Sequence, residues 1–220
     1  MLTLKRLLVF TLMAAFTWAM SAAAQDPPSL DNILAGIEKR YAGKGFSATF
    51  FQESILKAMQ ITDTAEGTLT VKSPGKMHWA YTIPEVQKII TDGKEMWIYR
   101  PTDNQVMVGK APSYFGGGKG AGFLSDIRQI RKSFRIQLQP AQNDHHRLKM
   151  EPLKPTPELA DIVISVSKKT FQIDQVVTHN AYGDETRFIL DNYQFDINPD
   201  ENLFHFTIPK GVEVIKLEQF

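Results

Sequence analysis

The stretch FGGGKGAGFL at residues 115–124 contains five glycines and one lysine, a composition that can bind phosphate. In the phosphate-binding loop of nucleotide hydrolases, a lysine contacts the phosphates and the hydroxyl of a following Ser or Thr binds magnesium. Here Lys119 is followed by Gly120, so that hydroxyl is missing. The dinucleotide-binding fingerprint requires another glycine spacing, after a strand of a βαβ unit. The stretch therefore favours a role other than nucleotide binding.

The other side chains able to do chemistry are scattered along the chain. Among the five histidines only His145 and His146 are adjacent, and neighbours on a strand point to opposite faces of a sheet. Asp144 beside them would complete only a weak metal site, and a polar hairpin tip fits the stretch better. The absence of cysteine excludes disulfides, thiolate metal sites and cysteine nucleophiles. We therefore expect no catalytic residue, no metal and no cofactor, unless residues distant in the sequence converge in the fold.

The N-terminus has the pattern of an export signal. Lys5 and Arg6 precede the apolar run Leu7–Ala19, and three alanines end at residue 24. We expect residues 1–24 to be cleaved, leaving one soluble domain at 25–220. Without the two basic residues of the signal, 23 of the 25 basic residues remain against 24 acidic ones. This near-neutral balance without a basic stripe argues against a nucleic-acid partner.

Apolar residues then recur with two periods. Residues 29–41 carry Ile33, Leu34 and Ile37 at helical spacing behind a possible N-cap, Ser29. Beyond them the period is two in most segments, as in GTLTVK (67–72), KMHWAYTI (76–83), DIVISV (161–166) and LFHFTI (203–208). Turn residues such as Asp92-Gly93 separate these segments. We predict a mainly β fold of about ten short antiparallel strands that curl into a barrel or strongly bent sheet.

One segment interrupts the strands. FLSDIRQIRKSF (123–134) places Phe123, Leu124, Ile127 and Ile130 at helical spacing, and predicts a second amphipathic helix. Several strands are apolar on both faces, and MWIY (96–99) is one of them. Such strands need a cover on their second face. Packed helices and an open cavity for an apolar ligand explain this pattern equally well.

The segment 73–106 resembles the outer-membrane lipoprotein carrier (LolA-like) family of Gram-negative periplasms. Matches to the family pattern continue at FSATF (46–50) with Gln52, and near the C-terminus at Phe204, Phe206, Pro209 and Gly211-Val212. The matching positions of the central segment are Pro74, Trp79, Ile89, Ile90, Asp92, Gly93, Lys94, Trp97, Tyr99 and Pro101.

The resemblance implies an unclosed β-barrel with a lid of α-helices over an apolar cavity, in a periplasmic protein that is not an enzyme. It also implies a carrier that takes acylated lipoproteins from an inner-membrane ABC transporter and passes them to an outer-membrane receptor. We expect a monomer. An alternative is a periplasmic protein that binds or senses another amphiphile, as an envelope stress sensor does, although such a sensor would normally carry an additional domain. An enzyme acting on lipid or cell-wall material would need a buried acid or histidine facing the cavity.

We predict three groups of functional residues, and the choice of Met96 and Ile98 over Trp97 and Tyr99 is not decided by the pattern. The expected acyl-chain contacts are Met77, Trp79, Tyr81, Ile90, Met96 and Ile98. The expected lid residues are Ile33, Leu34, Ile37, Phe123, Leu124 and Ile127. The expected hinge residues are Gly116, Gly117, Gly118, Gly120 and Gly122, although a surface loop without a gating role also fits the glycines.

One position departs from the family pattern. Well-studied members have an arginine immediately before the turn proline, where it hydrogen-bonds the lid. This sequence has Ser73 there, and Lys72 points to the opposite strand face. We therefore expect the lid to be held in another way, or the transfer partners to differ.

Overall fold

Twelve strands pair into one sheet in the computed structural model, which describes residues 29–111 and 122–217. The strands are β1 (Gly45–Leu56), β2 (Ile61–Lys72), β3 (Lys76–Ile83), β4 (Gln87–Thr91), β5 (Glu95–Arg100), β6 (Gln105–Lys110), β7 (Phe134–Gln142), β8 (His145–Pro152), β9 (Asp161–Ser167), β10 (Ile173–His179), β11 (Glu185–Phe195) and β12 (Glu213–Lys216). Their order across the sheet is β12-β6-β5-β4-β3-β2-β1-β11-β10-β9-β8-β7.

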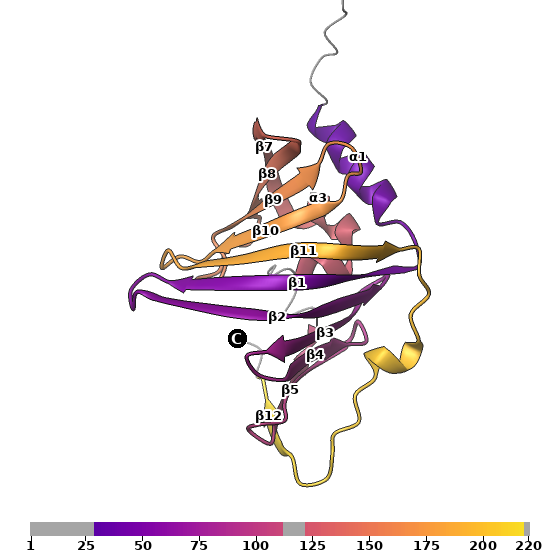
Figure 1. The fold of residues 1–220 in the computed structure, drawn as a ribbon, viewed down its shortest axis with the longest axis vertical. Helices are drawn as coiled ribbons and strands as arrows, with labels where there is room; N and C mark the ends of the chain where they lie inside the picture. The colour runs from indigo at the N-terminus through magenta and orange to yellow at the C-terminus, as the bar shows by residue number, and fades with distance from the viewer. Residues whose placement is uncertain (1–28, 112–121, 218–220) are drawn as a thin grey trace, which may run out of the picture.

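Neighbouring strands are antiparallel, except that β12 lies parallel to β6. Between the two end strands, β12 and β7, no pairing occurs in the described part of the chain, so the sheet curves without closing (Figure 1). The long β1–β2 hairpin reaches beyond its neighbours at the left of the view. The predicted mainly β, unclosed antiparallel fold is confirmed, although the strand number exceeds the predicted ten and the central strands are long.

The predicted Asp92-Gly93 turn aligns β4 with β5. Gly93 has a positive φ of 93°, which glycine adopts without strain. Asp92 Oδ1 accepts the backbone N–H groups of Lys94 and Glu95 at 2.8 Å each. Burial alone would raise the pKa of the Asp92 carboxyl, but these hydrogen bonds outweigh it and the pKa is lowered. The turn therefore fixes which side chains of β4 and β5 lie on the same face.

The first predicted helix is present as α1 (Leu30–Arg40). The side chain of Ser29 caps it by accepting the N–H of Asn32 at 3.3 Å. Ile33, Leu34 and Ile37 form its buried stripe. The sequence therefore predicted this helix, its start and its buried face correctly.

The second predicted helix is broken into short turns. The segment forms η1 (Gly122–Ser125), η2 (Ile127–Gln129) and the single-turn helix α3 (Ile130–Ser133). Asp126 causes the break, because its side chain accepts the N–H of Arg128 and so begins a new turn. The apolar residues of the segment are nevertheless buried. We call α1, η1, η2 and α3 together the helical cover.

The segment LFHFTI (203–208) is not a strand, and this prediction was wrong. Asp200 accepts the N–H of Asn202 at 3.0 Å and starts the 3-10 turn η3 (Glu201–Phe204). The chain then runs on without strand pairing as far as β12. We call residues 199–217 the C-terminal strap. In Figure 1 it descends along the right of the sheet and returns at the bottom to β6.

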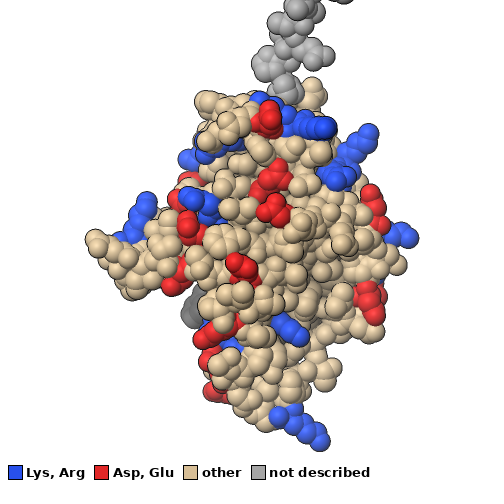
Figure 2. All heavy atoms as spheres, viewed as in Figure 1, with Lys and Arg blue, Asp and Glu red and all other residues tan. Residues whose placement is uncertain are grey.

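The sheet has two faces with separate apolar clusters. The inner face carries Phe50 and Trp79 and packs against the helical cover. The outer face carries Ile90, which packs against Phe206 of the C-terminal strap. Figure 2 shows acidic and basic side chains interspersed over the face it presents, without a stripe of either sign. Among the helices of residues 29–111 and 122–217, none has both the length and the apolarity to cross a bilayer.

Candidate apolar binding site

Four of the six predicted acyl-chain contacts share the inner face and are buried. Pairing across β3, β4 and β5 gives one row of Met77, Thr91 and Met96 and a second row of Trp79, Ile89 and Ile98. Paired residues in adjacent strands point to the same side of a sheet. Met96 and Ile98 therefore lie on the side of Trp79, and Trp97 and Tyr99 lie on the other. Met96 and Ile98 form a small cluster of their own, which Ile89 links to the main one.

Tyr81, the fifth predicted contact, follows Trp79 by two positions on β3 and so points to the same face. It is partly buried against the main cluster. Its hydroxyl donates to Gln52 Oε1 at 2.9 Å, and Gln52 Nε2 donates to Ser54 Oγ at 2.9 Å. Tyr81 therefore stands where the apolar floor of the inner face meets polar side chains.

Ile90, the sixth, lies on the wrong face for the predicted role. It pairs with His78 on one side and with Trp97 on the other, and packs with Trp97 on the outer face. Its neighbour Ile89 takes the inner position, because successive residues of a strand alternate between faces. The sequence run Ile89-Ile90 is apolar at both positions, so its pattern did not distinguish them.

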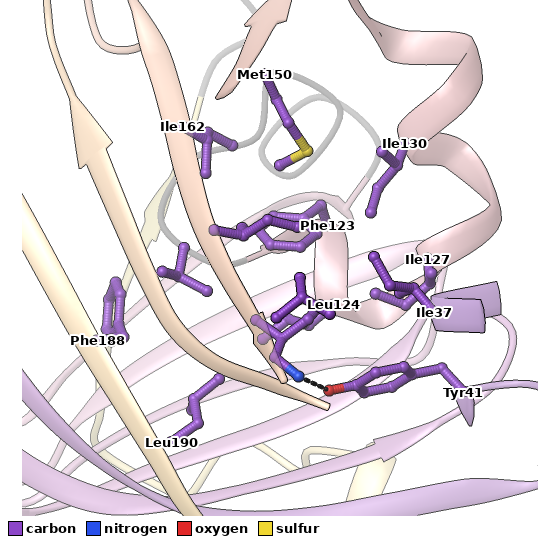
Figure 3. Packing of buried hydrophobic residues seen from close by; sticks show 14 of the residues in the cluster. Ile37, Tyr41, Phe123, Leu124, Ile127, Ile130, Met150, Ile162, Phe188 and Leu190 are labelled. Carbon is purple, nitrogen blue, oxygen red and sulfur yellow. Dashed lines mark hydrogen bonds between the residues drawn. The ribbon is translucent and has the colours of Figure 1, made fainter. Parts of the chain in front are cut away.

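The six predicted lid residues converge with the strand residues in one continuous cluster. Ile33 and Ile37 are fully buried, and Leu124 is 1% exposed. All six belong to the cluster that contains Met77 and Trp79. Figure 3 shows Ile37, Phe123, Leu124 and Ile127 gathered with strand residues, among them Ile162 and Phe188. Side chains of the helical cover therefore occupy the space over the inner face.

The predicted hinge falls largely on residues that the structure does not describe. Gly116, Gly117, Gly118 and Gly120 lie outside the described ranges. Gly122 opens η1 and is buried.

Sequence reasoning missed two aromatic residues of the site, Phe50 on β1 and Phe188 on β11. Their ring centroids lie 5.0 and 5.1 Å from that of Trp79. The Phe50 ring also lies 4.9 Å from that of Tyr81. Gly67 makes room, since a Cβ there would lie 2.9 Å from the Phe50 ring. The period-two spacing of Phe46, Ala48 and Phe50 was the available signal for Phe50.

Tyr41 joins the end of α1 to the sheet. Its hydroxyl accepts the N–H of Ile173 at 3.0 Å, drawn in Figure 3, and donates to the Tyr193 hydroxyl at 3.3 Å. Tyr193 in turn donates to the carbonyl of Ile173 at 2.7 Å. Burial raises the pKa of Tyr41 to about 12, which keeps the hydroxyl protonated. The guanidinium of Arg40 lies 3.6 Å from the centre of the Phe195 ring, a cation–π contact.

Arg131 joins the two parts of the helical cover. From α3 its guanidinium donates to Asp31 Oδ1 at 2.8 Å and to Glu38 Oε1 at 2.6 Å, both on α1. It also donates to the carbonyl of Asp31 at 3.3 Å. These hydrogen bonds, first from Asp31 and then from Glu38, raise the pKa of Arg131. Because one planar group binds two carboxylates, α1 and α3 are held in one relative position.

The turn before β3 contacts the cover through its backbone. The N–H of Gly75 donates to the carbonyl of Ser125 at 3.0 Å. Among the described residues this is the one hydrogen bond between η1 or η2 and the sheet or its turns. Ser73 borders a hollow of about 420 Å³ that Tyr41, Ile127 and Arg128 also line. The backbone of Gly75 therefore contacts the cover where the family resemblance led us to look for an arginine side chain.

A second hollow, of about 350 Å³, is lined by Gly75, Gly93, Phe123 and Phe134, among others. It borders both ends of the segment Gly122–Ser133, and the first hollow borders the middle of that segment at Asp126, Ile127 and Arg128. The segment is therefore not packed on all sides.

The histidines do not converge on the inner face. His145 pairs with Asp174 at 2.8 Å, and His179 pairs with Asp161 at 2.8 Å and with Glu185 at 3.6 Å. Burial, followed by the charge of Lys168, lowers the pKa of His146. Within residues 29–111 and 122–217, no group of three His, Cys, Asp or Glu side chains is arranged to hold a metal ion. The chemistry that the site offers is apolar contact, with polar groups at one end.

Similar proteins match this chain over most of its length. An outer-membrane lipoprotein carrier protein of Hahella chejuensis is 27% identical, with 97% of each chain covered. One of Chromobacterium violaceum is 29% identical, covering 90% of this chain and 95% of that one. The crystal structure of an uncharacterized conserved protein from Thermus thermophilus has the same fold, with a TM-score of 0.55 at 14% identity, over 86% of this chain and all of that one.

The strongest finding concerns the family itself. The model of the family described as outer membrane lipoprotein carrier protein LolA matches residues 42–207, which include eleven of the twelve strands in full. The match begins just after α1 and ends in the C-terminal strap, so it contains strands β1 to β11 together with η1, η2 and α3 of the helical cover. The chain belongs to the LolA family of outer membrane lipoprotein carrier proteins.

Proposed function

We propose that this protein is a periplasmic carrier that binds the acyl chains of lipoproteins on the inner face of its sheet. One observation carries the proposal: the apolar side chains of the helical cover and those of the strands form a single buried cluster. An acyl chain offers the same kind of surface as the cover, and could replace it on the strands. The names of the relatives support lipoproteins as the cargo.

In such an exchange, the free energy gained by burying acyl chains is offset by the free energy lost when the helical cover leaves the inner face. Burying an acyl chain gains about 0.8 kcal/mol per CH₂. Several long chains would together exceed the practical limit of non-covalent binding, roughly −20 kcal/mol. If the cover must leave the inner face before the chains enter, its lost contacts offset much of this gain. The carrier can then also release its cargo, because the cover returns to the same surface.

We place the protein in a transport route on the basis of its family. Residues 1–24 would direct export and be removed, leaving residues 25–220 as one monomeric carrier domain. The donor would be an inner-membrane ABC transporter that releases lipoproteins, and the acceptor an outer-membrane lipoprotein receptor. The description of the family as outer membrane lipoprotein carrier proteins supports a carrier rather than an enzyme.

Native mass spectrometry of the full protein, purified from its own periplasm without detergent, tests the proposal. We expect an added mass that matches an acylated lipoprotein. A free phospholipid instead would indicate a different amphiphile. A bare chain that also binds no fluorescent acyl probe would overturn the proposal.

Two variants locate the site. Trp79→Asp places a carboxylate on the inner face, and we expect it to abolish probe binding without unfolding the sheet. Phe51→Asp is the matched control, because Phe51 is an aromatic residue on the outer face of β1 and is partly exposed. Equal loss of binding in both variants would contradict the assignment of the inner face.

A further inference from the structure

Trp79 has a buried hydrogen-bond donor without an acceptor. Its side chain is 3% exposed, and among the described residues no hydrogen-bond partner lies at Nε1. Buried N–H groups in native proteins are nearly always paired, and each exception calls for an explanation. A phenylalanine would supply an apolar ring at this position without carrying that donor. The indole N–H therefore points to a partner that the described chain does not supply.

Two aromatic rings lie beside the indole. Phe50 and Phe188 lie at 5.0 and 5.1 Å from its ring centroid, and both present hydrocarbon rings. The face of an aromatic ring accepts an N–H bond far more weakly than a carbonyl oxygen does. The Tyr81 hydroxyl, two positions along the strand, donates to Gln52 and does not accept from the indole. A carbonyl oxygen brought in by a ligand would give the N–H an acceptor.

The inner face changes from apolar to polar along the strands, and Trp79 stands near the change. Register gives successive rows across β1, β2 and β3, beginning with Phe46, Val71 and Met77, and continuing with Ala48, Leu69 and Trp79. The next row contains Phe50, Gly67 and Tyr81. Beyond it, Gln52 pairs with Ala65 on one side and Phe188 on the other, and Ser54 pairs with Thr186.

This gradient suits an amphiphile in one orientation. The apolar rows, which contain Met77 and Trp79, belong to the cluster that also includes the helical cover. The opposite end carries Gln52 and Ser54, joined to each other and to Tyr81 by hydrogen bonds. An acyl chain would lie among the apolar rows, and its polar head would lie towards Gln52. The carbonyl that links chain to head would then pass close to the boundary at which Trp79 stands.

We propose that Trp79 Nε1 donates a hydrogen bond to the ester or amide carbonyl at the head of a bound acyl chain. This inference rests on the proposed function and adds to it the ligand class, a carbonyl-linked acyl chain, and the direction in which it lies. A hydrocarbon without the carbonyl would gain apolar contact only and would leave the indole N–H unpaired.

A pair of lipids that differ only in the carbonyl tests this proposal. 1-Palmitoylglycerol has an ester carbonyl, and 1-O-hexadecylglycerol has an ether in its place. Each is used to displace a fluorescent acyl probe from the full-length protein. We expect the wild type to bind the ester about five- to tenfold more tightly, which corresponds to one hydrogen bond to a donor otherwise left unpaired. We expect Trp79→Phe to bind both lipids with the affinity of the ether.

Trp97→Phe is the matched control. Trp97 is also buried but lies on the outer face with Ile90, so this variant should keep the full preference for the ester. Both variants are first compared with the wild type by thermal melting. The indole fluorescence of Trp97→Phe is then followed during titration in protein from which residues 1–24 have been removed, so that Trp18 is absent and Trp79 is the indole observed. An emission shift with the ester that is absent with the ether would support the hydrogen bond independently of the affinity.

The results of these experiments distinguish the role of the Trp79 indole from the carrier function. A wild type that binds both lipids equally, or a Trp79→Phe variant that keeps the preference, overturns the role of the indole and leaves the carrier function standing. A wild type that binds neither lipid and does not bind the probe overturns the proposed function, and this inference with it.

Discussion

The two faces of the sheet are covered by segments held in different ways. The helical cover meets the inner face mainly through apolar side chains, and hydrogen bonds tie it to the sheet or its turns at a few points. These bonds are donated by Gly75 to Ser125 of η1, by Leu153 to Ser133 of α3, and by Ile173 to Tyr41 at the end of α1. The C-terminal strap crosses the outer face and is fixed by directional bonds along its length. Both bury apolar residues, so burial alone does not distinguish them.

The bonds of the strap begin before η3 and continue to its end. Lys72 Nζ donates to the carbonyl of Pro199 at 2.9 Å and pairs with Glu201 Oε1 at 2.8 Å. Asn104 binds the carbonyl of Gly211 at 2.8 Å, and β12 pairs with β6. Detaching this segment would break many hydrogen bonds in turn. An amphiphile could not replace those bonds.

The difference between apolar contacts on the inner face and directional bonds on the outer face indicates that the inner face can exchange its covering segment for a ligand. Apolar contact is non-directional, and a ligand of similar apolar surface can replace it. Backbone pairing and ion pairs need partners at fixed positions. We infer that the helical cover is the part that yields to a ligand and that the strap keeps the curved sheet intact meanwhile. Four substitutions test this contrast.

Leu124→Asp should have the largest effect. It places a carboxylate at a position that is 1% exposed, among the apolar side chains of the main cluster. We expect a loss on the order of 3 kcal/mol, which lowers the melting temperature by about 10 °C. The far-ultraviolet signal of the strands should remain, and binding of a hydrophobic dye should increase, because the cover leaves an intact inner face.

The control for this change is Lys132→Asp, an exposed position of α3 in the same cover. It should melt within about 2 °C of the wild type, as surface substitutions usually do. If Leu124→Asp lost the strand signal as well, the cover would be part of the folding core and the contrast with the strap would fail.

Tyr41→Phe should have the next largest effect. It removes the hydroxyl that accepts the N–H of Ile173 and donates to Tyr193, and leaves that buried N–H without its acceptor. The expected cost is about 1–3 kcal/mol of unfolding free energy, measured by urea denaturation. Tyr182→Phe is a suitable control, since Tyr182 is 75% exposed. An unchanged stability would mean that α1 is not tied to the sheet at this point.

Arg131→Ala should have a smaller effect on stability but a visible one on binding. The side chain is about a third exposed, so solvent weakens its two ion pairs and the loss should be about 1 kcal/mol. Because α1 and α3 would then move separately, we expect faster entry of an acyl probe in stopped-flow mixing. Arg131→Lys should resemble Arg131→Ala, since an ammonium does not hold both carboxylates in a planar geometry. Entry at the wild-type rate in both variants would exclude this role.

Secondary structure was predicted correctly from the sequence where the spacing of apolar residues and the capping residue indicated the same element. Ser29 begins a helix whose apolar stripe is buried, and both features are local. The break at Asp126 was missed because an aspartate within a helical period does not reveal whether it caps a new turn. Phe204 and Phe206 alternate as a strand would, but Asp200 starts a turn before them and no partner strand takes the segment up.

For the candidate site, alternation along each strand together with the register gives the face on which a side chain lies. Met77 and Trp79 were placed by their own strand, whereas Ile89-Ile90 required the pairing with β5. The contacts of Trp79 with Phe50 and Phe188 join residues from three strands, two of them far apart in the sequence. Such contacts follow from the strand order, which a single sequence does not contain.

Glu201→Gln should have the smallest effect, confined to the strap and to acid pH. Hydrogen bonds from Lys72 and then Lys76 lower the pKa of the Glu201 carboxyl from 4.5 to about 2. A carboxyl whose pKa is lower in the folded state stabilises that state fully above its unfolded pKa, and loses the contribution as pH falls through the folded one. The melting temperatures of wild type and variant should therefore differ above about pH 4.5 and converge towards pH 2. Acyl-probe binding at neutral pH should be equal in the two proteins, because Glu201 binds Lys72 and Lys76, which lie on the outer face. A difference in melting temperature that does not change with pH would show that the glutamate acts by packing instead. A loss of probe binding would show that the C-terminal strap and the helical cover are coupled. It would then be wrong to treat the helical cover as the only one of the two that affects ligand binding.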